Sequence, residues 1–101
     1  MLFTALLRVR EGSITNERAP RRLQYSYPEG ARPVSEYWLQ TTDPSDPHVV
    51  ATFEADGVAP IMVLMAAWDD HFDITVVPSI TAEEGLGLLE QMGQQAQQAQ
   101  T

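Results

Sequence analysis

The stretch VVATFEADGVAPIMVLMAAWDDHFDITVVPSI, residues 49–80, decides the fold. Its first run, residues 49–54, is mostly apolar, as expected of a strand whose two faces are both buried. Residues 58–68 form a dense apolar run that is long enough for a helix but too short for a membrane span, which needs about 20 residues. The last run, residues 72–80, is again strand-like and carries Pro78, which sheets tolerate mainly at edges or strand ends. The stretch therefore predicts a central strand, a helix and an edge strand.

Two more strand-like runs lie N-terminal to this stretch. Residues 2–9 begin with a nearly continuous apolar run and predict the other central strand, whereas residues 34–41 mix polar and aromatic residues and predict an edge. The turn-forming sequence TDPSDP, residues 42–47, joins the second strand to the third. Pro20 interrupts the polar, arginine-bearing stretch between the first two strands, so we expect only a short helix there, over residues 20–25.

The order of these segments predicts the fold class. Strand, helix, strand, strand, helix, strand is the βαββαβ order of a ferredoxin-like α+β domain. Central strands 1 and 3 with edge strands 2 and 4 give a four-stranded antiparallel sheet in the order 4-1-3-2. A capping box at Thr81 and Glu84 predicts an extra C-terminal helix. We expect one domain over residues 1–92 and a Gln/Ala-rich tail, residues 93–101, that has no apolar face and frays.

Charge is distributed unevenly along this acidic chain, whose net charge is −8. All six cations are arginines within the first 32 residues, where three acids leave a net charge of +3. Residues 33–101 carry the other eleven acids and no cation. The balance argues against nucleic acid or an anionic membrane as a partner, because phosphate binding needs concentrated cations. The two segments could attract one another within the fold or across a dimer, or both could be solvated surfaces.

The chain has no cysteine, which excludes disulfides and thiolate chemistry. No basic residue precedes the first apolar run, so that run does not resemble a secretory signal. A cytoplasmic protein is the expectation.

The chain also resembles a known family. The resemblance rests on these segments: EYWLQ at 36–40, EAD at 54–56, API at 59–61, Trp68, FDI at 72–74 with Pro78, and TAEEGL at 81–86. They are similar to a small bacterial and archaeal family, domain of unknown function 3303, in the dimeric α/β-barrel superfamily. The resemblance implies a homodimer in which two four-stranded sheets face each other. It implies no reaction, since some superfamily relatives are cofactor-free monooxygenases or haem-degrading enzymes and others only bind.

Aromatic side chains supply the candidate ligand-binding residues, which are Tyr37, Trp38, Phe53 and Trp68. They could line a cleft for a small apolar or aromatic molecule, or they could fill the core and the dimer interface. Two functions stay open. The first is a non-catalytic dimeric module that binds a small molecule or a protein. The alternative is a cofactor-independent, monooxygenase-like enzyme acting in a cleft between sheet and helices, with His48 or Glu54 as general base. Neither function calls for a metal or a cofactor.

Two further clusters have weaker signals. His71 lies among three aspartates, but these carboxylates are adjacent in sequence rather than spaced to converge, so we expect a solvated loop and not a metal site. An anion or aromatic-acid site could form beside the first helix, or the same side chains could be surface residues: Tyr25, Tyr27, Arg21 and Arg22.

Overall fold

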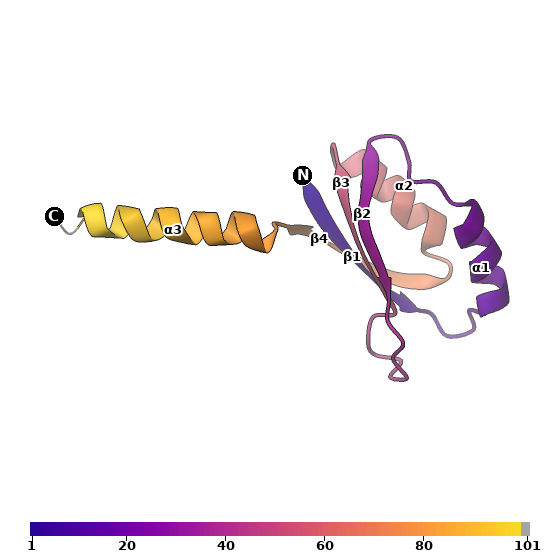
Figure 1. Cartoon of the computed structure of the whole chain (residues 1–101). Helices are drawn as coiled ribbons and strands as arrows, with labels where there is room; N and C mark the ends of the chain where they lie inside the picture. Colours follow the sequence, from indigo (N-terminus) through magenta and orange to yellow (C-terminus); the bar gives the residue numbers. More distant parts are fainter. Residues whose placement is uncertain (100–101) are drawn as a thin grey trace.

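The computed structural model describes residues 1–99 and has seven elements (Figure 1). In chain order they are β1 (Leu2–Val9), α1 (Thr15–Gln24), β2 (Ala31–Trp38), β3 (Val49–Ala55), α2 (Val58–Trp68), β4 (Phe72–Ser79) and α3 (Ala82–Ala99). The first six elements have the βαββαβ order of the ferredoxin-like fold, and α3 is added at the C-terminal end. The predicted fold class is therefore confirmed.

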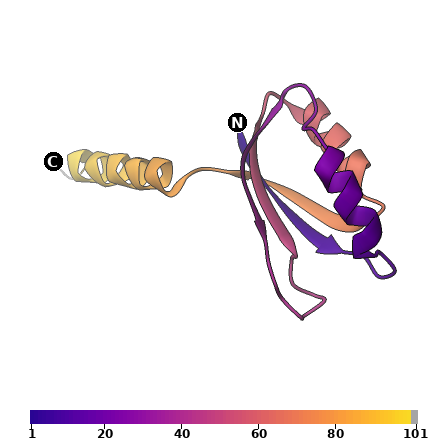
Figure 2. The same ribbon diagram turned by 45° about the vertical axis from the view of Figure 1, so that its right-hand side comes forward.

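The four strands form one antiparallel sheet in the order β2-β3-β1-β4, which confirms the predicted arrangement of central and edge strands. Leu6 in β1, for example, lies opposite Val50 in β3 and Thr75 in β4. Helices α1 and α2 cover one face of the sheet (Figure 2). We call this the helix-side face, and the other the open face.

Two elements begin earlier than the sequence predicts. Helix α1 starts at Thr15 rather than near Pro20, because the Ile14 carbonyl accepts the backbone N–H groups of Glu17 and Arg18 and opens the helix before the proline. Pro20 lies inside the helix, where it removes one N–H donor and its ring crowds the carbonyl one turn earlier, yet the helix continues to Gln24. Strand β2 starts at Ala31, three residues before the predicted Val34. A register shift between Pro33 and Ser35 places that proline at an irregularity of an edge strand, where the lost N–H is tolerated.

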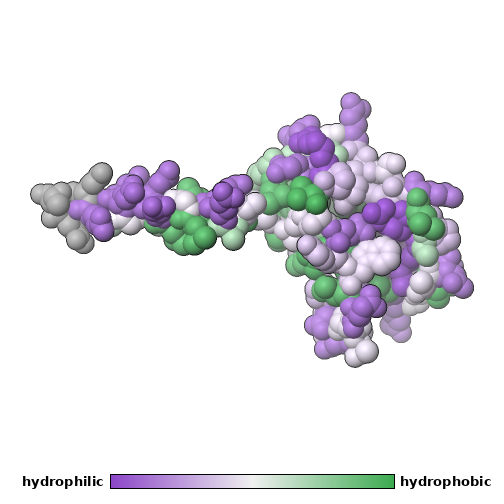
Figure 3. Space-filling model, viewed as in Figure 1, coloured by the Kyte–Doolittle hydropathy of each residue, from purple (hydrophilic) through white to green (hydrophobic). Residues whose placement is uncertain are grey.

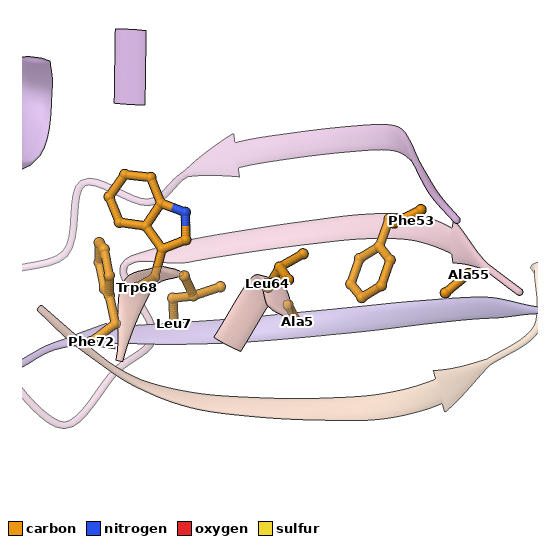
Figure 4. Packing of buried hydrophobic residues seen from close by; sticks show 8 residues of the cluster. Ala5, Leu7, Phe53, Ala55, Leu64, Trp68 and Phe72 are labelled. Carbon is orange, nitrogen blue, oxygen red and sulfur yellow. The ribbon is translucent and has the colours of Figure 1, made fainter. Parts of the chain in front are cut away.

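The core lies between the helix-side face and α2 (Figure 4), and α1 contributes no buried residue to it. Phe53, which is fully buried, is at its centre and stacks on Phe3 with ring centroids 5.9 Å apart. Trp68, at the end of α2, meets Phe72 edge-on at 5.9 Å. Because side chains alternate along a strand, β3 places Phe53 on this face and its neighbour Thr52 on the other.

The open face is formed by shorter side chains. Three threonines lie on it, one each from β1, β3 and β4, beside the aliphatic side chains of Leu6 and Val50. Charged groups lie toward the ends of the strands, where they are paired: Arg8 with Asp73 at 3.3 Å, and the N-terminal ammonium with Glu54 at 3.0 Å. The centre of this face is thus uncharged.

Helix α3 projects away from the sheet and the other helices (Figure 1). The Thr81 hydroxyl accepts the Glu84 backbone N–H at 3.1 Å, which is one half of the predicted capping box. The large apolar side chains of α3 are all exposed: Leu86, Leu88, Leu89 and Met92. Figure 3 shows hydrophobic surface among hydrophilic neighbours along this helix.

The predicted Gln/Ala-rich tail overlaps this helix. The helix continues through Gly93 to Ala99, and residues 100–101 lie outside the described part of the chain. Fraying of the tail stays a prediction. None of the helices in residues 1–99 combines the length and the hydropathy needed to cross a membrane. The cytoplasmic location also stays a prediction.

Candidate functional site

A pocket of about 330 Å³ lies between α1 and the helix-side face of the sheet. It lies within the range of roughly 300–1,000 Å³ that small-molecule sites occupy. We call it the α1 pocket. Helix α1 contributes the face with the spacing i, i+3, i+4 and i+7, which is the spacing of one side of a helix: Thr15, Arg18, Ala19 and Arg22. The sheet contributes residues of β1, β2 and β3, and α2 contributes Leu64 and Trp68.

Aromatic side chains form much of the wall of this pocket. The Tyr25 ring lies 5.4 Å from Trp68, edge-on, and 5.6 Å from Tyr27. Phe72 continues the wall beyond Trp68. Trp38 in edge strand β2 also lines the pocket, although it is 62% exposed, so it forms part of the rim. Such a wall presents flat, polarisable surface to a planar ligand.

An ion pair between α1 and β2 lies in the same wall. The Arg22 guanidinium donates to both carboxylate oxygens of Glu36, at 3.1 Å each, and the Trp38 indole N–H donates to Glu36 Oε2 at 2.6 Å. Burial alone would raise the pKa of Glu36, but the hydrogen bonds from Arg22 and Trp38 outweigh it and the pKa is lowered. Glu36 is therefore an ionised, fully engaged carboxylate, which suits it to hold α1 and Trp38 in place.

His48 lies in the pocket with one ring nitrogen already used. Its Nδ1 accepts the backbone N–H of Val9 at 3.1 Å, and its own backbone N–H donates to the Leu7 carbonyl at 2.8 Å. A nitrogen that accepts a hydrogen bond carries no proton, so the neutral ring has its proton on Nε2. His48 thus offers the pocket a hydrogen-bond donor rather than a free base.

The Tyr25 hydroxyl is the buried side-chain polar atom that lacks a hydrogen-bond partner in the described part of the chain. Burial raises the pKa of Tyr25, with a smaller contribution from Tyr27, so the phenol keeps its proton at neutral pH. A buried hydroxyl without a partner costs about 1–3 kcal/mol. Tyr25 lines the α1 pocket, but its hydroxyl oxygen has almost no accessible surface, so a ligand reaches it only when the side chains around it shift.

A second polar cluster holds Arg18 at the pocket. Arg18 donates to the hydroxyls of Ser13 at 2.8 Å and of Thr15 at 3.1 Å, and the Ser13 hydroxyl bonds His71 Nδ1 at 2.5 Å. The expectation that His71 lies in a solvated loop is wrong. The ring is 6% exposed, because its backbone joins the end of β1 through a hydrogen bond from Arg10 and its side chain is covered by the loop before α1.

Nearly all arginines pair with the acidic part of the chain. The pairs are Arg8 and Arg10 with Asp73, Arg21 with Asp70, Arg22 with Glu36 and Arg32 with Asp56. Every one of them joins the cation-bearing first 32 residues to the acid-only remainder. These arginines are therefore better described as attracted to the acidic segment within the fold than as charges on an independent, solvated surface. Arg21 and Arg22 are each paired with a carboxylate, and the anion or aromatic-acid site that the sequence suggested beside the first helix stays a prediction.

The structure brings together three of the predicted site residues, Trp38, Trp68 and His48, in the α1 pocket. The others lie elsewhere. Phe53 is buried in the core beyond the pocket lining, and Tyr37 lies on the open face of β2. Glu54 also lies on the open face, in its ion pair with the N-terminus. Any role of these three in binding stays a prediction.

Arg18 and Thr15 are site residues that the sequence reasoning missed. Their signal was the helical spacing of Thr15, Arg18 and Arg22, which becomes visible once the helix is allowed to begin before Pro20. Within residues 1–99 no group of three or more His, Asp or Glu side chains could hold a metal ion.

The fold and this pocket define a small ferredoxin-like α+β protein with a ligand-sized hollow beneath its first helix. The family model described as "Domain of unknown function (DUF3303)" matches residues 1–93, and the chain belongs to that family. No curated protein and no solved structure matches the chain. The family description carries no activity, so the function has to be argued from the site.

Proposed function

We propose that this protein is a homodimeric, non-catalytic module that binds a small planar apolar or aromatic molecule in the α1 pocket. The observation that carries the proposal is the pocket itself. It has about 330 Å³ of space against aromatic side chains and contains a buried hydroxyl without a partner. Small-molecule sites have this composition, with mostly apolar walls and a few polar groups that fix orientation.

Binding is favoured over catalysis by the state of the polar groups. Glu36 is neutralised by Arg22, and His48 has its Nδ1 occupied, so neither is free to take a proton from a substrate. Glu54, the other candidate base, lies on the opposite face of the sheet. A cofactor-independent, monooxygenase-like enzyme would need one of these groups to be released first.

The homodimer is supported by two surfaces. The open face presents threonines and short aliphatic side chains across its centre, which suits packing against a second sheet at a distance of about 10 Å. Helix α3 exposes its leucines and has no cover from the rest of residues 1–99, so a second copy is the natural partner for it. Light scattering should give twice the chain mass of 11.2 kDa at micromolar concentration.

The test of binding uses naphthalene-2-carboxamide as a neutral, planar probe, followed by calorimetry and by amide NMR shifts. We expect shifts at residues of the α1 pocket and none on α3. The Trp38→Ala variant should weaken binding about tenfold, because the rim of the pocket loses its largest flat surface.

The matched control is Tyr37→Ala. Tyr37 is the next residue on the same strand, is 64% exposed against 62% for Trp38, and lies on the opposite face. Its loss should leave affinity unchanged. Equal weakening by both variants, or a Trp38→Ala variant that loses only stability, would contradict the pocket. His48→Ala should affect affinity alone, and any turnover abolished by it would favour the enzyme.

A further inference from the structure

Arg18 differs from the other arginines of the described chain because no carboxylate lies within ion-pair distance of it. The other five arginines each pair with an aspartate or glutamate at 2.7–3.3 Å. Arg18 donates instead to two hydroxyls, those of Ser13 and Thr15. Hydroxyl groups orient a guanidinium but do not neutralise its charge, so Arg18 keeps an unpaired positive charge.

That charge is held in a fixed place. The guanidinium lies over the ring of Phe72, 5.9 Å from its centroid, and Phe72 and Arg18 both line the α1 pocket. The Ser13 hydroxyl that accepts from Arg18 is itself anchored on the buried His71 ring. The Ser13 hydroxyl accepts from Arg18 and shares a second hydrogen bond with His71 Nδ1, so two partners hold it in place. A charged group anchored in this way loses little freedom when it binds an anion.

The other groups of the pocket do not cancel the charge of Arg18. Arg22 and Glu36 neutralise each other, and His48 is neutral in the tautomer that its bond from Val9 requires. The pocket wall therefore carries a net charge of about +1, within a protein whose net charge is −8. Glu17 is the acidic residue of α1 and lies next to Arg18 in sequence. Its Oε2 lies 3.8 Å from His71 Nε2 rather than beside Arg18, and its side chain is exposed.

We infer that the α1 pocket selects aromatic carboxylates, with the ring against the aromatic wall and the carboxylate paired with Arg18. The inference rests on the proposed binding function and names the chemical class of its ligand. A guanidinium and a carboxylate match in geometry and form the strong, charge-assisted type of hydrogen bond. The Tyr25 hydroxyl, without a partner in the described chain, lies buried in a residue that lines the same pocket, and it becomes a further donor for a ligand oxygen once the side chains around it shift.

The experiment compares two probes of the same shape, naphthalene-2-carboxylate and naphthalene-2-carboxamide, by calorimetry on the full chain. The carboxylate should bind about ten- to a hundredfold more tightly than the amide, as expected for hydrogen bonds to a charged group. Raising NaCl from about 20 mM to about 500 mM should reduce this ratio, because salt screens the ion pair and leaves the ring contacts unchanged.

Variants assign the preference to one side chain. Arg18→Gln should bring the carboxylate close to the affinity of the amide, and it should weaken the amide much less, because the amide loses at most a neutral hydrogen bond. Arg18→Lys should keep part of the preference, since it keeps the charge but loses the planar pair of donors. The control is Arg32→Gln, which removes the same charge from an exposed ion pair with Asp56, outside the α1 pocket, and should leave both affinities unchanged.

The outcomes separate the two proposals. If the amide binds and the carboxylate binds no more tightly, the pocket is retained and the carboxylate preference is wrong. If neither probe binds to the wild type, the binding function itself fails. If Arg18→Gln does not fold, the salt dependence of the wild type and the Arg18→Lys variant still decide the matter, and a carboxylate preference that salt does not reduce overturns the role of Arg18.

Discussion

The two faces of the sheet are made from the same strands and differ in the size of their side chains. On the helix-side face, Phe53 and the aromatic residues around Trp68 fill the layer beneath α2. On the open face, threonines alternate with Leu6 and Val50, and no helix covers them. Where α1 stands away from the sheet, the large side chains of the helix-side face surround a ligand-sized hollow. The short side chains of the open face give a surface that can lie against another sheet. In the proposed function, the alternation of side chains along the same strands supplies a ligand-binding face on one side of the sheet and a dimerisation face on the other.

The largest effect is expected from a substitution at the centre of the helix-side face. Phe53→Ala should lower the free energy of unfolding by about 3–5 kcal/mol, because it empties a fully buried site. Thr52→Ala, one residue away on the open face, should cost about 1 kcal/mol for its lost hydrogen bond with Ser35. Urea denaturation measures both. Similar losses of stability for the two variants would mean that the two faces are buried to the same extent.

The open face is tested by its oligomeric state. Val50→Glu places a charge at the centre of that face and should convert the proposed dimer to a monomer of 11.2 kDa, because an unpaired carboxylate buried in the interface is costly. Leu23→Glu, at an exposed position of α1, should leave the dimer intact. Light scattering with a far-UV spectrum reports assembly and folding together. A dimer that survives Val50→Glu would place the interface elsewhere, with α3 the next surface to examine.

A smaller effect concerns the ion pair that holds α1 over the helix-side face. Because the pKa of Glu36 is lowered in the folded state, its contribution is complete above the ordinary value of about 4.3 and is lost as the pH falls through the lower folded pKa. Glu36→Gln should therefore cost about 1 kcal/mol at pH 7, a modest figure because Arg22 is 39% exposed and water screens the pair.

The measurement is the free energy of unfolding from pH 7 to pH 3. The curves of the wild type and Glu36→Gln should converge at the acidic end. Glu29→Gln, an exposed residue without an ion pair in the described chain, should run parallel to the wild type throughout. A constant difference between the wild type and Glu36→Gln across the range would show that the loss comes from packing rather than from charge.

Periodicity and turn chemistry were enough to predict the sheet, since β1, β3 and α2 are apolar segments whose lengths distinguish strand from helix. Composition was not enough to predict the burial of α2, where Leu64 and Trp68 are buried but Met62 is exposed. Periodicity and turn chemistry were also not enough to predict where α1 begins. Pro20 can be read from the sequence, but the contacts that hold the helix from Thr15 onward cannot. The site was therefore predicted in part. Trp38, Trp68 and His48 come from predicted elements, whereas Arg18 depends on where α1 begins.

The smallest effect concerns a single atom of the helix-side face, the hydroxyl of Tyr25. Tyr25→Phe should leave stability unchanged or raise it by about 1 kcal/mol, because it removes a buried group that has no partner in the described chain. The same change should weaken binding of naphthalene-2-carboxylate, which would otherwise satisfy that hydroxyl.

Thermal unfolding and calorimetry on one sample measure both quantities, and Tyr27→Phe is the matched control. Burial raises the pKa of Tyr25, so the stabilisation from its neutral form is complete below the ordinary value of about 10. This stabilisation is lost only as the pH rises beyond that value. Measurements at neutral pH therefore report the effect of removing the hydroxyl, free of its ionisation. A variant that loses stability without losing affinity would make the hydroxyl part of the core. A variant that loses affinity without losing stability would show that the hydroxyl serves ligand binding rather than the stability of the fold.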